Sequence, residues 1–363
     1  LFMEGLLKPV EYRDAEKLSL KWVSIGIQSD PEKDRKRKWE GLCKAIAKNI
    51  PSADDRYTQW SAFAWRWAEL VALSCEDKTR LTFEDQKEMS DLRSQVDANF
   101  LSWCHKRYAG LYNLPSDPPV MLHHIPKFLS HRLKEEENSR LALIVVDGLS
   151  LDEWLVVRDA LSRQCPSLRF RENTVYAWIP TLTYVSRQSL FAGKPPLYFP
   201  GSIQSSSQEA MLWNRFWLDH ELHSTEAGYV KNLGDGDLSE IQRLIDNSPC
   251  KVVGLVVDKV DKIIHGMELG TAGMHNQVHQ WISEGYLLRL IEYLRQQKFH
   301  IWLTSDHGNI EAVGIGSPSE NSLADLRGCR ARIYPTETLR ALTKQRSEER
   351  RVGKECRVRW SPY

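Results

Sequence analysis

Residues 141–148 read Leu-Ala-Leu-Ile-Val-Val-Asp-Gly, and this stretch decides the fold class. Such a short β-rich run of apolar residues is typical of a strand buried in a parallel sheet. The predicted strands are Leu141–Val146, Val252–Val257 and His300–Thr304, with Thr174–Trp178 as a further candidate. The predicted helices between and after them are Asp152–Arg163, Ser186–Phe191 and Val278–Gln297. The alternation predicts an α/β domain with a doubly wound, mostly parallel sheet.

An α-helical region is predicted ahead of this domain, over residues 1–113. Apolar residues recur there at steps of three and four, which indicates amphipathic helices. The predicted helices are Asp34–Ile50, Tyr57–Cys75 and Asp85–Tyr108. Aromatic residues such as Trp60 and Trp103 share their apolar faces. We interpret these aromatic faces as packing between helices, and a base-stacking platform is the alternative.

The remaining boundaries follow from changes in composition. Residues 114–138 are predicted to be a linker, because they contain three prolines by Pro119 and the charge run Lys134–Glu137. The α/β core then covers residues 139–345. Residues 346–363 have no apolar period and resemble a translated sequencing adapter, so we expect a non-native tail; a basic tail that binds an acidic partner is the alternative. Because the chain begins at Leu1 and not at Met, we expect the helical region to be truncated at its start. Because the tail is expected to be non-native, we expect the core to be truncated near Gln345.

Composition excludes several classes of protein. The 363 residues are 42% hydrophobic and 10% aromatic, too apolar for a disordered chain. A formal net charge of +1 gives no general attraction to nucleic acid or anionic lipid. No apolar run approaches the ~18 residues that span a bilayer, and the first residues do not read as a secretory signal. The seven cysteines form no CxxC pair, so we expect a cytoplasmic location.

Side chains that bind metals follow each of the three strands. They are Asp147 after the first strand, Asp258, Asp261 and His265 after the second, and Asp306 and His307 after the third. Ligands of open α/β sheets bind beyond the carboxyl ends of the strands, so these side chains are expected to converge. Carboxylates packed together repel one another, and the set therefore predicts divalent metal. Mixed nitrogen and oxygen ligands suit zinc and accept manganese.

Two threonines stand near the start of a predicted helix, in Pro180-Thr-Leu-Thr183. A threonine held between two metals at a helix N-terminus can act as a nucleophile. The metal lowers the pKa of its hydroxyl, and the helix amides favour an incoming phosphate. The sequence therefore predicts phosphoryl chemistry at this edge of the sheet.

These motifs, in this order, resemble the alkaline phosphatase superfamily and, within it, the PglZ domain of bacterial phage-defence (BREX) systems. The ordered set is Asp147-Gly148, Pro180-Thr-x-Thr183 with Leu190-Phe-x-Gly193, Asp261-x-x-x-His265 and Ser305-Asp-His-Gly308. The resemblance covers about residues 139–345. It implies an alkaline-phosphatase-like fold that holds two divalent metal ions, zinc or else manganese.

The resemblance also implies roles for individual residues. Asp147, Asp306 and His307 are similar to the ligands of one metal, and Asp261 and His265 to two ligands of the second, with Asp258 as the fallback for Asp261. Thr183 is similar to the nucleophile that bridges the metals, and we prefer it to Thr181. Arg187 is expected to touch a phosphate oxygen, or else to form a surface salt bridge.

One departure from the family pattern concerns the second metal. The family takes another His ligand from a loop after the Asp-His-Gly motif, and no His follows His307 in this chain. The second metal site is therefore expected to be incomplete, and this fragment to be weakly active or inactive. His275 and His279 are spare imidazoles, which we interpret as surface residues.

The resemblance implies a metal-dependent phosphohydrolase that cleaves phosphodiesters or phosphomonoesters, nucleotides or nucleic acid among them, in phage defence. The alternative is a non-catalytic or weakly catalytic scaffold that binds other subunits of a defence complex. Phosphoglycerate mutase-like isomerisation is a third interpretation. It is disfavoured because the short spacing from Thr183 to Asp261 leaves no room for that family's long inserted domain.

Overall fold

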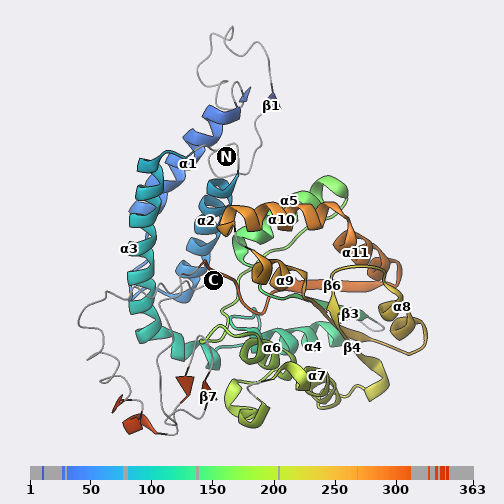
Figure 1. Ribbon diagram of the computed structural model, residues 1–363. Helices are drawn as coiled ribbons and strands as arrows, with labels where there is room; N and C mark the ends of the chain where they lie inside the picture. Colours follow the sequence, from blue (N-terminus) through green and yellow to red (C-terminus); the bar gives the residue numbers. More distant parts are fainter. Residues whose placement is uncertain are drawn as a thin grey trace.

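The protein is described by a computed structural model that covers residues 31–76, 81–135, 139–202, 205–267 and 269–311, with short pieces at 10–11, 27–28, 326–327, 332–333, 336–339 and 341–342. A four-stranded, all-parallel sheet lies in the α/β part (Figure 1). Its order is β4 (Ala227–Leu233), β5 (Val252–Val257), β3 (Arg140–Val146) and β6 (Phe299–Thr304). The three predicted strands are confirmed, and β4 was not predicted.

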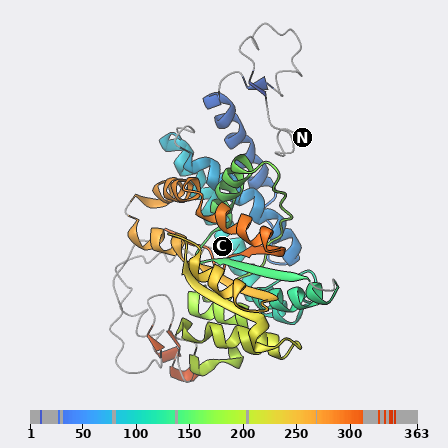
Figure 2. The same ribbon diagram turned by 90° about the vertical axis from the view of Figure 1, so that its right-hand side faces the viewer.

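Helices cover both faces of this sheet (Figures 1 and 2). One layer consists of α5 (Leu151–Gln164), α8 (Ser239–Asp246), α9 (Lys259–Gly266), α10 (Gly270–Ser283) and α11 (Tyr286–Gln296). The other consists of α4 (Ile125–Glu135), α6 (Thr183–Ala192) and α7 (Glu209–Leu218). Residues of β3 alternate between the two layers: Ile144 and Val146 pack into the first core, and Leu143 and Val145 into the second. The doubly wound α/β fold is therefore confirmed.

Three long helices precede the sheet, as predicted: α1 (Pro31–Lys48), α2 (Tyr57–Cys75) and α3 (Phe83–Arg107). Their aromatic faces meet in one core, where Trp39, Trp60 and Trp103 are almost fully buried. Trp60 meets Phe100 edge to face, with 4.9 Å between the ring centroids. The packing interpretation of these faces is therefore confirmed, because these rings form the core between the three helices.

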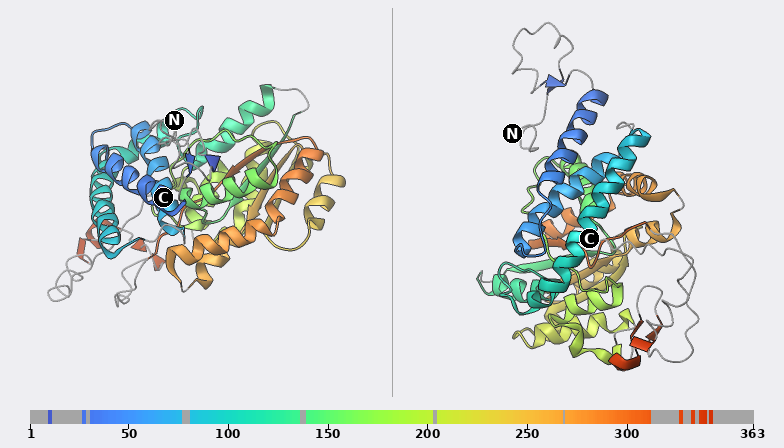
Figure 3. Two further views of the ribbon diagram at one scale, coloured as in Figure 1. Left: turned by 90° about the horizontal axis from the view of Figure 1, so that it is seen from above. Right: turned by 90° about the vertical axis from the view of Figure 1, so that its left-hand side faces the viewer.

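The helical region is joined to the α/β core. Helix α2 packs against α5 and α10, and the view from above shows the three helices of the region beside the sheet layers (Figure 3). The Tyr176 hydroxyl donates to the Tyr57 carbonyl at 2.8 Å, and the Tyr108 hydroxyl donates to the Ala177 carbonyl at 2.6 Å. The segment around Tyr176 thus bridges the two regions.

Several local predictions differ from the structure. The expected linker 114–138 instead contains α4, whose Phe128 and Leu129 are buried under the sheet. The expected helix Val278–Gln297 is two helices, because Gly285 (φ 77°) breaks it between α10 and α11. The candidate strand Thr174–Trp178 makes only an isolated bridge, from Tyr176 to Met121. Apart from these differences, the division of the chain into units stays a prediction.

Short elements complete the described chain. They are η3 (Tyr108–Asn113), η4 (Leu122–His124), η5 (Pro196–Tyr198), η6 (Pro200–Ser202), η7 (Ser206–Gln208), η8 (Ser224–Glu226), β1 (Val10–Glu11), β2 (Ile27–Gln28), β7 (Leu326–Arg327) and β8 (Arg332–Ile333). The expected tail 346–363 lies outside the described residues. Within the described part, none of the helices combines the length and apolarity that crossing a membrane requires.

Candidate metal centre

The central strands end at the same level of the sheet. Val146 of β3 pairs with Val257 of β5, and Val145 pairs with Thr304 of β6. Because the strands are parallel, the residues that follow them reach one edge together. Gly148 turns the chain there with a φ of 74°, and a Cβ at this position would lie 2.9 Å from Ile264 Cδ1 of α9. The turn therefore needs glycine, which tolerates a positive φ and fills no space.

Asp147, Asp306 and His307 form a compact buried cluster at this edge, which we call the first centre. Their potential ligand atoms all lie within 4.8 Å of one another. His307 Nε2 lies 3.8 Å from Asp147 Oδ1 and 3.7 Å from Asp306 Oδ2. The three residues are 4, 0 and 7% exposed, in sequence order. The sequence-predicted ligands of one metal are thus brought together.

Each carboxylate of the first centre has one oxygen held by protein and one without a partner. Asp306 Oδ1 accepts hydrogen bonds from the backbone nitrogens of Gly148 (3.1 Å) and His307 (3.0 Å). Asp147 Oδ2 accepts one from the Arg187 guanidinium. The other oxygens, Asp147 Oδ1 and Asp306 Oδ2, are buried without a hydrogen-bond partner among the described residues. Buried polar atoms are seldom left unpaired, so these two oxygens fit a divalent cation, which would satisfy both.

The ring of His307 is also oriented in a way that fits a divalent cation. Its Nδ1 lies 2.8 Å from the Gly308 carbonyl oxygen, which can only accept, so Nδ1 carries the proton in the neutral ring. Nε2 therefore presents its lone pair toward the two free carboxylate oxygens. An outer hydrogen bond of this kind fixes the tautomer of metal-binding histidines.

Burial makes the first centre electrostatically unfavourable without a cation. Removal from water, followed by repulsion from Asp306, raises the pKa of Asp147 to about 9, even though Arg187 acts to lower it. The carboxyl would thus hold its proton at neutral pH. A bound divalent cation would favour the ionised form, and this competition couples metal binding to proton release.

Thr183 reaches the first centre from helix α6. It is the first residue of the helix, after Leu182 in an extended conformation. Its Oγ1 lies 2.9 Å from His307 Nε2, and the hydroxyl donates because Nε2 is the unprotonated nitrogen. The first amides of a helix lack intrahelical acceptors and attract anions. Thr183 therefore contacts a candidate metal ligand from the first position of a helix, whereas Thr181 lies before the helix begins.

Arg187, one turn further along α6, is buried between two carboxylates. Its guanidinium contacts Asp147, and its Nε donates to Glu209 Oε1 of α7 at 2.8 Å. Glu209 is 1% exposed, and its other oxygen accepts from the Tyr229 hydroxyl at 2.6 Å. The alternative of a surface salt bridge is therefore wrong, because Arg187 is itself only 6% exposed. The predicted contact between Arg187 and phosphate stays a prediction.

Asp261 and His265, which we call the second pair, lie on one turn of α9 next to the first centre. Asp261 Cα and His307 Cε1 each lie 3.9 Å from the position that a Gly148 Cβ would take. Asp261 Oδ1 lies 3.4 Å from His265 Nε2, but the His265 side chain is 72% exposed. The fallback residue Asp258 is ion-paired with Lys262 at 2.9 Å. The structure thus places the second pair beside the first centre without closing a site around it.

Other residues around the centre were missed or misjudged from the sequence. Asn309 Nδ2 donates to the Gly148 carbonyl and to Glu153 Oε1, both at 2.9 Å, and so ties the loop after β6 to the loop after β3. Glu153 is buried, and burial and then Asp152 raise its pKa to about 7. His275 is not a surface residue, because it is 5% exposed and its Nε2 lies 2.7 Å from Asp152 Oδ2. His279 is exposed, as expected.

Comparison with known families agrees with this geometry. A family model, described as the PglZ alkaline phosphatase-like domain of BREX systems, matches residues 127–355, more than half of the chain. The search of curated proteins found no match to the chain. The matched range begins within α4, contains all seven predicted site residues and leaves α1, α2 and α3 outside.

Proposed function

Since the chain belongs to the family of PglZ alkaline phosphatase-like domains of BREX systems, we propose that it is a metal-dependent phosphohydrolase with Thr183 as its nucleophile. One observation carries this proposal. The Thr183 hydroxyl lies 2.9 Å from His307 Nε2, at a cluster whose two free carboxylate oxygens have no protein partner among the described residues.

Asp147, Asp306 and His307 would hold the first divalent ion, zinc or else manganese, through their free oxygens and Nε2. Asp261 and His265 would contribute to a second ion. A bound ion would supply a lower pKa for the Thr183 hydroxyl and electrostatic stabilisation of phosphate oxygens. These ligand types are the mixed nitrogen and oxygen donors that zinc and manganese accept.

Different residues of the chain would have different roles in the hydrolysis of a phosphate ester. Thr183 Oγ1 would form the bond to phosphorus as its hydroxyl proton passes to water and the bond from phosphorus to the leaving oxygen breaks. The leaving oxygen would take up a proton from water, and a further water molecule would then cleave the phosphothreonine. The free amides of the first turn of α6 bind the phosphate oxygens. Arg187 orients Asp147 and places a positive charge beside the reaction, where it can also meet a phosphate oxygen.

The test compares a diester with a monoester. Hydrolysis of bis-p-nitrophenyl phosphate and p-nitrophenyl phosphate is measured with zinc or manganese, with chelator, and in the variants Thr183→Ala and Thr181→Ala. We expect chelator and Thr183→Ala each to lower turnover by a factor on the order of 10³ or more, as loss of a nucleophile does. Thr181→Ala is the matched control and should keep most of the activity. The preferred ester identifies the class of substrate.

A non-catalytic or weakly catalytic scaffold in a phage-defence complex is the second candidate. The exposed His265 favours it, because no third candidate ligand joins the second pair among the residues that the structure describes. The helical region would then bind other subunits of the complex, and the protein would act in the cytoplasm. A folded, metal-bound protein that hydrolyses neither ester would support this function and contradict the hydrolase.

A further inference from the structure

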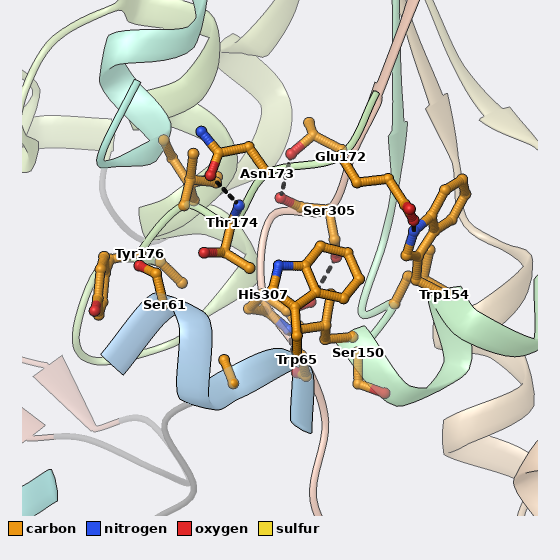
Figure 4. A pocket seen from close by; sticks show the side chains of 18 of the residues that line it. Ser61, Trp65, Ser150, Trp154, Glu172, Asn173, Thr174, Tyr176, Ser305 and His307 are labelled. Carbon is orange, nitrogen blue, oxygen red and sulfur yellow. Dashed lines mark hydrogen bonds between the residues drawn. The ribbon is translucent and has the colours of Figure 1, made fainter. Parts of the chain in front are cut away.

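A cavity of about 210 Å³ lies beside the first centre, between helix α2 and the edge of the sheet (Figure 4). Its lining residues belong to the same three chain segments that carry the proposed reactive groups, or lie next to them in the sequence. Residues 149–151 follow Asp147, residues 171–177 lead toward Thr183, and residues 303–308 include Asp306 and His307. A molecule in the cavity therefore lies against the segments that build the centre.

Aromatic rings and a few polar groups line this cavity. Figure 4 shows Trp65 of α2 beside Ser305 and His307, with Trp154 of α5 at one side and Tyr176 at the other. The Trp154 indole is fixed, because its Nε1 donates to Glu172 Oε1 at 2.6 Å. Asn173 Oδ1 accepts from the Thr174 backbone nitrogen at 2.8 Å, which leaves its NH₂ group to donate. Half-buried aromatic faces with a few hydrogen-bonding groups are typical of sites for planar ligands.

The size and the charge of the cavity limit the kind of ligand that it can bind. Pockets that enclose a whole drug-sized molecule usually measure about 300–1,000 Å³, so this smaller cavity accepts one ring system and not an entire nucleotide. Arg171, Glu172 and Asp306 line it, so its charged groups offer an anion no net attraction. The occupant is therefore an uncharged planar group, whereas a phosphate belongs at the first centre.

We propose that this cavity binds a nucleobase, the planar part of a nucleotide whose phosphate lies at the first centre. The proposal rests on the proposed function and deepens it. Trp65 and Ser61 belong to α2, outside the matched range 127–355, so the helical region would supply a wall of the substrate site. That region would select the substrate in addition to any role in binding partners.

The test uses binding, which does not depend on turnover. Calorimetric titration of the zinc-loaded protein compares adenosine 5′-monophosphate with ribose 5-phosphate, which differ only by the base. We expect the nucleotide to bind at least about fivefold more tightly, the low end of what stacking one base contributes. Trp65→Ala should remove this preference, and Trp65→Phe should keep part of it. Ser61→Leu, which fills the cavity without removing a ring, is the second test should Trp65→Ala fail to fold.

Trp302→Ala is the matched control. Trp302 is 36% exposed, packs edge-on against Phe128 and does not line the cavity. Equal binding of the two probes, or a preference that survives both Trp65→Ala and Ser61→Leu, would overturn the proposal. The dinucleotide ApA tests whether the base belongs to a free nucleotide or to a nucleic-acid strand. Binding equal to that of the mononucleotide indicates a free nucleotide, and stronger binding indicates a strand. In both cases the base occupies the same cavity. If the protein prefers the nucleotide over ribose 5-phosphate but hydrolyses neither ester, the base-binding cavity is supported and only the proposed reaction of Thr183 is contradicted.

Discussion

The first centre and the second pair contain the same residue types, but the fold treats them differently. The residues of the first centre follow the ends of β3 and β6 and are buried, and each is held by a hydrogen bond on one side. Asp147 Oδ1 and Asp306 Oδ2 have no partner among the described residues, and His307 Nε2 meets only the Thr183 hydroxyl at hydrogen-bond distance. The second pair lies on a single turn of α9, and its His265 is 72% exposed. Burial and fixed outer partners, more than residue type, therefore prepare a site for an ion.

The largest difference between the first centre and the second pair is expected when one carboxylate is removed from each. Asp306→Asn replaces the free Oδ2 with either an uncharged oxygen or an NH₂ group, so zinc affinity should fall by more than the about 10–100-fold that loss of an outer partner costs. Asp261→Asn should lower the affinity of the tightest ion by less than about tenfold, the lower limit of that range. Competition with a zinc-binding dye measures both variants. Equal losses would show that the two sets form one site.

The next effect concerns the buried Arg187, which has no counterpart at the second pair. Arg187→Met leaves the Glu209 carboxylate buried without its cation and removes the hydrogen bond to Asp147, so the free energy of unfolding should fall by about 3–5 kcal/mol. Arg215→Met is the control: its pair with Asp219 is solvent-exposed, and its loss should cost about 1 kcal/mol or less. Urea unfolding in the presence of chelator measures both. A small effect of Arg187→Met would mean that water reaches the carboxylates.

Proton binding gives a third test, because Asp147 is held protonated in the metal-free protein. Its pKa is about 9 when folded, above the ordinary 3.8, so its stabilising effect is full below the ordinary value and is lost as pH rises through the folded pKa. Between pH 6 and 8 it should therefore lower the free energy of unfolding by about 1.4 kcal/mol per pH unit. Asp147→Asn should remove this part of the slope. A slope that is unchanged in the variant would assign it to other groups.

The smallest effect is expected at the second pair. His265→Gln removes an exposed imidazole, so the free energy of unfolding should change by no more than about 0.5 kcal/mol. The affinity for a second zinc ion should fall, while the first ion stays bound, which calorimetric titration resolves. A loss of stability above about 1 kcal/mol would show that His265 has a structural role despite its exposure.

The buried strands and the first centre were predictable because their signals are local. Each strand is a short stretch of chain, and Asp147, Asp306 and His307 follow directly from strand ends. Strand β4 gave no such signal: it lies at the sheet edge, and Lys231 and Asn232 are exposed within it. The charge run at residues 134–137 led to the prediction of a linker where α4 lies. Phe128 and Leu129 form the apolar face of this helix and pack under the sheet.

Partners far apart in the sequence could not be predicted in the same way. Glu209 lies 22 positions after Arg187 on another helix, and no motif links the two. His275 and His279 look equivalent in sequence, but only His275 is turned toward Asp152 of α5. Which face of α10 meets α5 depends on how the helices pack, and the spacing of two histidines does not contain that information.

The separation of Asp147 from its partners also has a consequence for synthesis of the protein. The backbone nitrogen of Gly148 donates to Asp306, which lies 158 positions later, and β6 is the last strand of the sheet to leave the ribosome. At about 5–20 residues per second, the growing chain exposes Asp147 roughly ten to thirty seconds before His307 is made. During that interval the nascent protein has no complete first centre. A chain interrupted before β6 has joined the sheet therefore lacks the first centre, and the proposed hydrolysis would have to wait for that strand.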